Sequence, residues 1–269
     1  MKLSISTLGC PDWDFLRVVK EFSALHCDIE VRGIDGEMDA DKIVRFDAAH
    51  AAQTKAILQE NGVKLIGFGT SCSFHDADKR AQNVEQAKNA VDVCVRMGIP
   101  AIRVFGNDIP DPSKMEETAA CVCEGLKEVC AYAAPKGIGV NLEIHGDFNS
   151  FAAVSLLVEG MKGVAGFGIL WDVEHSDKTC GDDFMPFYRL IQPVLKHVHI
   201  KDYHRAKGDK PFELCLVGQG DIPLKAILAQ LEKDGYAGYL SFEWEKKWVP
   251  ALPEPEVAFP AFAAYMQAL

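Results

Sequence analysis

The sequence predicts a protein of the α/β class, folded as a single (β/α)8 TIM-barrel domain over residues 1–269. Eight short apolar runs alternate with longer stretches of helical character, and no remaining segment is large enough for a second domain. The runs are almost continuously apolar, which is typical of parallel strands covered on both faces. With 48% hydrophobic residues, the chain can fill the core of one such barrel.

The first four strand–helix units follow in order from the N-terminus. Asp12 can cap the first helix, and Gly62 and Gly98 can end the second and third. The predicted strands are 2–8, 28–33, 64–71 and 101–107, and the predicted helices are 12–26, 47–61, 76–97 and 113–134.

The last four units repeat the pattern, but an irregular stretch at 204–220 separates the seventh strand from its helix. The predicted strands are 140–145, 168–174, 197–203 and 239–244, and the predicted helices are 150–160, 182–191, 223–234 and 255–267.

An open, doubly wound sheet is the alternative arrangement of such units. A dinucleotide-binding sheet of that kind carries GxGxxG after its first strand, whereas this chain has LGCPDWD there. It also lacks a GxxxxGK[ST] phosphate loop. These differences favour the closed barrel.

The composition excludes several classes of partner. The net charge is −11 and no dense block of Lys and Arg occurs, so we expect no nucleic-acid partner. The apolar runs are too short to cross a membrane, and the N-terminal MKLSISTLG alternates like a strand and not like a signal peptide. Nine cysteines without CxxC spacing indicate reduced core thiols. We expect a cytoplasmic protein with a small-molecule substrate, and the sequence leaves a homo-oligomer possible.

Acidic or imidazole side chains stand at the C-terminal ends of the last four strands. They are Glu143, Asp172, His199 and Glu243. The C-terminal ends of barrel strands meet at one rim, so the four side chains are expected to converge. Any one of them alone could be a rim ion pair or a helix cap. Together, three carboxylates and one imidazole predict one divalent cation, with Mn²⁺ favoured and Mg²⁺, Co²⁺ or Zn²⁺ as alternatives.

Other polar residues near the rim have less certain roles. His197 and His199 face the same side of their strand, and His199 is nearer the rim, so His197 is expected deeper in the barrel. Glu30 could orient a ligand or form an ion pair inside the barrel. Lys201 and Asp202 could form an ordinary ion pair with each other.

The motifs NLEIH, WDVEH, HVHIKDYHR and LSFEWE resemble the xylose-isomerase-like TIM-barrel superfamily, in its sugar phosphate isomerase/epimerase family. The branch includes ketose 3-epimerases, hydroxypyruvate isomerase and inosose dehydratase. The resemblance implies the same four metal ligands and substrate contacts from His175 and Arg205. From position alone, His175 could instead be a helix cap and Arg205 a solvated loop charge. The chain differs from the epimerases at Asn149, where they tend to have an acidic residue, and it lacks the histidine-rich set of endonuclease IV.

The resemblance and the ligand set together imply a sugar, sugar phosphate or keto-polyol isomerase or epimerase. Glu143 and Glu243 are the expected catalytic pair, one removing and the other returning a proton through a metal-stabilised enediolate. The alternatives are an inosose-type dehydratase on the same site, a non-catalytic sugar-binding barrel and a hydrolytic zinc enzyme. The loop at 218–221 could bind phosphate, act as a lid or be a plain connection.

Overall fold

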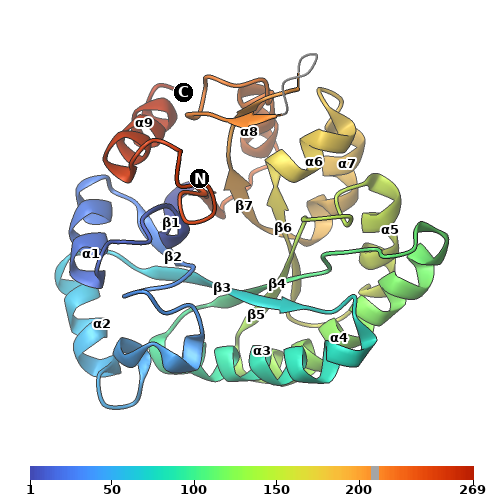
Figure 1. Ribbon diagram of the computed structural model, residues 1–269, viewed down its shortest axis with the longest axis horizontal. Helices are drawn as coiled ribbons and strands as arrows, with labels where there is room; N and C mark the ends of the chain where they lie inside the picture. The colour runs from blue at the N-terminus through green and yellow to red at the C-terminus, as the bar shows by residue number, and fades with distance from the viewer. Residues whose placement is uncertain (207–211) are drawn as a thin grey trace.

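The computed structural model describes residues 1–206 and 212–269. Eight parallel strands close into a barrel in the order β1-β10-β7-β6-β5-β4-β3-β2, with helices around the outside (Figure 1). Pairing of β1 with β10, in which Lys2 lies beside Tyr239, closes the ring. The predicted fold class is therefore confirmed, and the open sheet is wrong. The barrel strands are β1 Lys2–Ser6, β2 Asp28–Val31, β3 Leu65–Ser73, β4 Ala101–Phe105, β5 Gly139–Glu143, β6 Phe167–Asp172, β7 Leu195–Ile200 and β10 Tyr239–Phe242.

A helix follows each barrel strand and covers the outside of the ring (Figure 1). The α-helices are α1 Phe15–Ala24, α2 Ala51–Glu60, α3 Ala77–Met97, α4 Met115–Ala133, α5 Phe151–Gly160, α6 Val173–Cys180, α7 Met185–Ile191, α8 Leu224–Lys233 and α9 Pro255–Gln267. Short 3-10 turns lie at η1 Thr7–Gly9, η2 Ala40–Lys42, η3 Val44–Phe46, η4 Pro112–Lys114, η5 Ala134–Lys136 and η6 Gln192–Val194.

Capping side chains explain where several helices begin. Asp76 caps α3. Gly98 ends this helix with φ of 75°, as the sequence predicts. The first helix begins later than predicted, because Asp14 and not Asp12 accepts the backbone N–H of Arg17 at 2.8 Å. The prediction of Asp12 as the cap is wrong, since both aspartates are suitable caps and only the chain path chooses between them.

The largest difference from the predicted elements lies after β6. The strand was expected to run to residue 174, but it ends at Asp172. The Asp172 carboxylate accepts the backbone N–H groups of Glu174 and His175, so it caps the additional helix α6. The predicted helix at 182–191 is observed as α7, which begins at Met185.

The stretch expected to be irregular contains a short antiparallel hairpin. Strand β8, Tyr203–His204, pairs with β9, Glu213–Leu214. Residues 207–211 of the predicted irregular stretch lie outside the described residues.

One continuous apolar core extends between the barrel and its helices. All nine cysteine thiols are free, and six are buried, as expected of small core residues. Among the described residues, no helix has both the length and the apolar content needed to span a bilayer. The buried ionisable acidic, basic and histidine side chains of the strands and of the two positions after each strand are Glu30, Arg32, Arg103, Glu143, Asp172, Glu174, His197, His199, Lys201, Asp202 and Glu243.

Candidate metal centre

The four predicted ligands converge on one point. Glu143 and Asp172 are the last residues of β5 and β6, His199 lies in β7, and Glu243 directly follows β10. One donor atom from each lies within 4.8 Å of the others, and all four residues are buried. His199 Nδ1 is 3.4 Å from Glu243 Oε2, 3.6 Å from Glu143 Oε1 and 3.8 Å from Asp172 Oδ2. Asp172 and His199 are register partners, so strand pairing itself brings them together.

Three of the buried donor atoms lack a hydrogen bond from the protein, although cations lie near two of them. Glu143 Oε2, Asp172 Oδ2 and His199 Nδ1 make no hydrogen bond among the described residues. Buried polar atoms of this kind are costly unless something pairs with them. A divalent cation among these oxygen and nitrogen donors would satisfy them together, and the hard, oxygen-rich set suits Mn²⁺ or Mg²⁺. The residues therefore fit the implied metal.

Glu30 fixes the orientation of both histidines. Its Oε1 lies 2.8 Å from Nε2 of His199 and its Oε2 lies 3.0 Å from Nε2 of His197. When the ring is neutral and Nε2–H donates to Glu30, the lone pair of His199 Nδ1 faces the three carboxylates, and a bound cation would take the place of the Nδ1 proton. His197 also contacts Glu30 through its Nε2 atom. It does not belong to the group of four ligands.

Two buried cations also reach the ligands. Lys201 Nζ lies 2.9 Å from Asp172 Oδ2, 2.6 Å from Glu243 Oε2 and 2.6 Å from Glu245 Oε1. Arg103 Nε lies 2.9 Å from Glu143 Oε2, although its N–H is not aligned for a hydrogen bond. Sequence reasoning missed both roles. The position of Lys201 could have indicated its role, because it lies two residues after His199 and alternate residues of a strand face the same side.

The predicted ion pair between Lys201 and Asp202 is wrong, because Asp202 organises a loop instead. Its Oδ2 accepts the backbone N–H groups of Gly218 and Gly220, both at 2.9 Å. Its Oδ1 accepts N–H groups from Tyr203 and Ile222. The loop at 218–221, considered for phosphate binding, thus already donates two of its amides to a carboxylate of the chain.

The charges of the cluster control its ionisation. Burial opposes the charged form of Glu143, but the charge of Arg103 helps to hold its pKa below the ordinary value. Burial likewise opposes the charged forms of Asp172 and Glu243, and Lys201 is the main group that lowers the pKa of each. Against its burial, Glu30 and the other carboxylates raise the pKa of His199 well above its usual range. The three acidic ligands are therefore ionised and ready to bind a cation.

His175 and Arg205, the predicted substrate contacts, occupy different surroundings. The His175 ring lies 4.2 Å from that of His145, and burial lowers its pKa to about 4. Arg205 donates to both oxygens of Asp177, at 3.0 and 2.7 Å, and pairs with Asp182 at 2.9 Å. Arg205 does not line the cavity beside Glu143.

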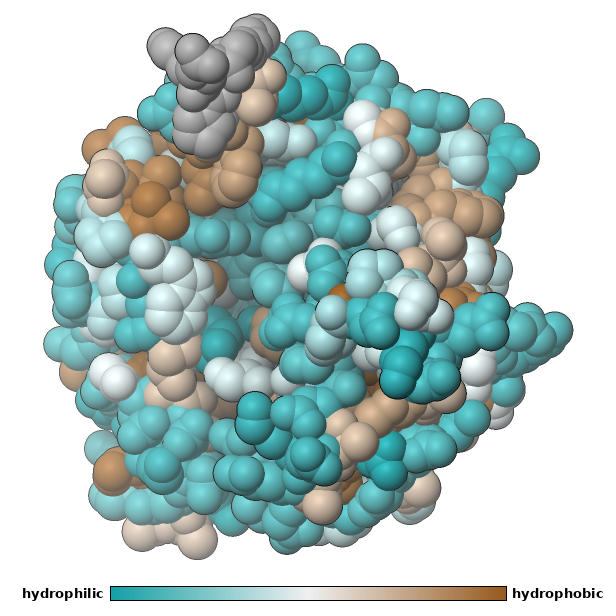
Figure 2. Space-filling model, turned by 45° about the vertical axis from the view of Figure 1, so that its right-hand side comes forward, coloured by the Kyte–Doolittle hydropathy of each residue, from teal (hydrophilic) through white to brown (hydrophobic). Residues whose placement is uncertain are grey.

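A cavity of about 100 Å³ opens beside the ligands. The face shown in Figure 2 is hollowed, and the floor of the hollow is mostly hydrophilic. The lining combines carboxylates, cations and two aromatic rings, a mixture suited to a small polar ligand. Its lining residues are Leu8, Arg32, Arg103, Phe105, Glu143, His145, Lys201, Glu243, Glu245 and Trp248.

Comparison with known proteins identifies the family. Residues 28–267 match the family model described as xylose isomerase-like TIM barrel, so the chain belongs to that family. The uncharacterized protein YihM of Escherichia coli strain K12 is 22% identical to this chain over 222 residues. The match covers 73% of this chain and 66% of YihM, just under two thirds of YihM.

Solved structures show the same fold at low sequence identity. The 3-keto-D-glucoside 4-epimerase YcjR from E. coli is 19% identical, with a TM-score of 0.76 and full coverage of both chains. The IOLI protein, solved with a bound zinc atom, is 17% identical, with a TM-score of 0.78 over 100% of this chain and 96% of that one.

Proposed function

We propose that the protein is a divalent-metal-dependent isomerase or epimerase of a small carbohydrate. The observation that carries the proposal is the convergence of two buried glutamates, Glu143 and Glu243, on one cavity beside three unsatisfied donor atoms. Membership of the xylose isomerase-like family and the similarity to the epimerase YcjR support this class of reaction.

Glu143, Asp172, His199 and Glu243 would hold the cation, for which we propose Mn²⁺. When bound, the ion supplies Lewis-acid polarisation of a carbonyl group. Glu30 keeps His199 oriented, and Lys201 and Arg103 keep the carboxylates ionised.

Glu143 and Glu243 would transfer the proton. Arg103 contributes to the lowered pKa of Glu143 and Lys201 to that of Glu243, so each carboxylate can accept a proton from a substrate carbon at neutral pH. They come from β5 and β10, on either side of β6 and β7 in the barrel, and one can remove a proton while the other returns it. The position that is reprotonated decides between epimerisation and aldose–ketose exchange.

His175 and Arg205 are proposed to contact the substrate. His175 lies beside His145, which lines the cavity, so its ring is close enough to bind a hydroxyl group at the rim. Arg205 would need to exchange part of its pairing with Asp177 to reach the same substrate.

The test is deuterium uptake from solvent into carbon, using a panel of ketoses, aldoses and inososes with Mn²⁺. We expect uptake with at least one sugar, lost on chelation, and reduced about 10²–10⁴-fold by Glu143→Gln or Glu243→Gln. Glu117→Gln, on the exposed surface of α4, is the matched control.

Other outcomes would replace the proposal. Release of water with formation of an unsaturated product would identify the inosose-type dehydratase on the same residues. Sugar binding without any uptake or product would identify a non-catalytic sugar-binding barrel.

A further inference from the structure

Arg32 is a buried cation that forms no direct ion pair among the described residues, although the charges of Glu243 and Glu143 act on it from a greater distance. It directly follows β2 and is 7% exposed. Its NH2 group donates to Ser71 Oγ at 2.9 Å, while NH1 has no hydrogen-bond partner within the described residues. None of the carboxylates that the structure describes approaches it within ion-pair distance. A charged group held in this way is costly to the fold.

The neighbouring cations differ from Arg32 in this respect. Arg103 lies 2.9 Å from Glu143, and Lys201 contacts three carboxylates at 2.6 to 2.9 Å. All three cations line the cavity that contains Glu143 and Glu243. Of these three cations, Arg32 is the one that has no carboxylate within ion-pair distance, so its guanidinium can still bind an anion directly.

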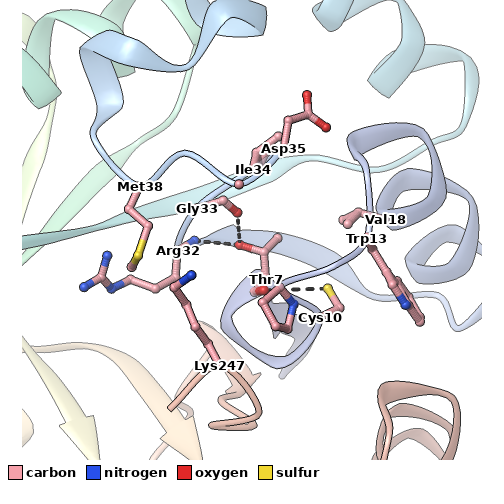
Figure 3. A pocket seen from close by; sticks show the side chains of 12 residues that line it. Thr7, Cys10, Trp13, Val18, Arg32, Gly33, Ile34, Asp35, Met38 and Lys247 are labelled. Carbon is pink, nitrogen blue, oxygen red and sulfur yellow. Dashed lines mark hydrogen bonds between the residues drawn. The ribbon is translucent and has the colours of Figure 1, made fainter. Parts of the chain in front are cut away.

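The fold does not need the Arg32 guanidinium to join β1 to β2. The backbone N–H of Arg32 donates to Thr7 Oγ1 at 2.8 Å, and Thr7 Oγ1 donates to the carbonyl oxygen of Gly33 at 2.7 Å. Figure 3 shows these bonds on one side of Arg32, while its guanidinium extends away from Thr7 and Cys10 toward Met38. The backbone of Arg32 is thus held by Thr7, while its guanidinium bonds only to Ser71 through NH2 and leaves NH1 without a partner among the described residues.

A second unpaired cation lies close by. Lys247 borders the small cavity of Figure 3 together with Arg32. Its ammonium group lies 5.7 Å from the ring centroid of Trp248 and forms no ion pair with the carboxylates of residues 1–206 and 212–269. The acidic residue of that cavity, Asp35, is already bound to Arg45 at 2.5 Å.

We propose that the substrate carries an oxyanion group, a carboxylate or a phosphate, which Arg32 binds in the catalytic cavity, with Lys247 as a secondary contact from the adjoining cavity that Arg32 also lines. This inference rests on the proposed function, because it names the substrate class of the same site. A guanidinium fork suits both groups, since it offers parallel N–H donors to two oxygens. The bound anion would supply the charge and the hydrogen-bond acceptor that Arg32 lacks.

Three related sugars test the inference: neutral D-fructose, D-fructuronate with a carboxylate at C6, and D-fructose 6-phosphate. Binding to the Mn²⁺-loaded protein is measured by calorimetry, and turnover by solvent deuterium uptake. We expect one of the two anions to bind about 10- to 100-fold more tightly than D-fructose. Arg32→Gln should remove that preference, Arg32→Lys should restore part of it, and Arg189→Gln, an exposed arginine on α7, should retain it.

The results separate this inference from the proposed function. Arg32-dependent anion binding without deuterium uptake would support the anion site and contradict the isomerase. Uptake with D-fructose, combined with no preference for either anion or no effect of Arg32→Gln on that preference, would support the isomerase and overturn the anion site. The melting temperature of Arg32→Gln should equal or exceed that of the wild type, because an unpaired buried charge is removed. A large decrease would indicate a structural role for Arg32.

Discussion

Glu30 Oε1 lies 2.8 Å from His199 Nε2, and this contact turns the opposite ring nitrogen toward Glu143, Asp172 and Glu243. The same carboxylate holds His197 at 3.0 Å. A carboxylate from β2 therefore sets the orientation of a ligand on β7, which is three strands away around the barrel, beyond β1 and β10.

Replacing Glu30 should weaken the metal centre without unfolding the protein. In Glu30→Gln the amide keeps the size of the side chain but loses the charge that supports both histidines. We expect the affinity for Mn²⁺ to fall about 10- to 100-fold. Electron paramagnetic resonance of free Mn²⁺ in titrations measures the change. Glu116→Gln, on the first turn of α4, is the control, and equal affinities for the wild type and Glu30→Gln would contradict the assigned role.

Lys201 should matter most when no metal is bound. Lys201→Met leaves buried Asp172 and Glu243 without their closest cation, and breaking a buried ion pair on one side typically costs about 3–5 kcal/mol. We expect a lower melting temperature in chelator and a partial recovery with Mn²⁺, which neutralises the same oxygens. Scanning calorimetry with and without metal measures both effects. Lys162→Met, a surface substitution, should change neither, and a metal-independent loss in Lys201→Met would refute the explanation.

Gly69 leaves space for the two arginines of the cavity. A Cβ at this position would lie 2.7 Å from Arg103 NH2 and 2.8 Å from Arg32 Cδ. We expect Gly69→Ala to cost about 1–3 kcal/mol of unfolding free energy, because both side chains must shift. Urea denaturation measures this loss. Gly139→Ala on β5, where the nearest atom is 3.5 Å away, is the matched control, and similar stabilities for the two variants would show that the arginines adjust freely.

Asp202 should stabilise the chain between β7 and α8. It accepts four backbone N–H groups, including those of Gly218 and Gly220. Asp202→Ala would leave them unpaired, at a cost of about 1–3 kcal/mol. Hydrogen exchange at 218–222 should become faster, with little change in the barrel strands. Asp183→Ala, at an exposed position, provides the comparison, and unchanged exchange in Asp202→Ala would show that other contacts hold the loop.

The sequence could predict the barrel and the convergence of the four metal ligands. The types of these residues and their positions at strand ends can be read directly from the sequence. The ligands are Glu143, Asp172, His199 and Glu243. The sequence could not predict the partners of Glu30, which are more than 160 residues away. Such pairings depend on the diameter and closure of the barrel.

Helix α6 was missed for a local reason. The run WDVEH continues the apolar pattern of β6 through Val173, so the periodicity alone favours a longer strand. The helix forms because Asp172 caps it, and an aspartate at the end of a strand can equally remain a simple rim residue. The unpaired state of Arg32 was also beyond the sequence, since it depends on which carboxylates the folded barrel places near other cations.

The two oxygens of Asp172 connect the first turn of α6 to the metal centre. Oδ1 accepts the N–H groups that start the helix, while Oδ2 faces His199 and Lys201. Any rotation of this carboxylate toward an arriving ion would be transmitted to the helix that carries His175. Binding of a metal ion and the placement of His175 would thereby be linked through one carboxylate, and the position of His175 at the rim would differ between the metal-free and the metal-bound protein.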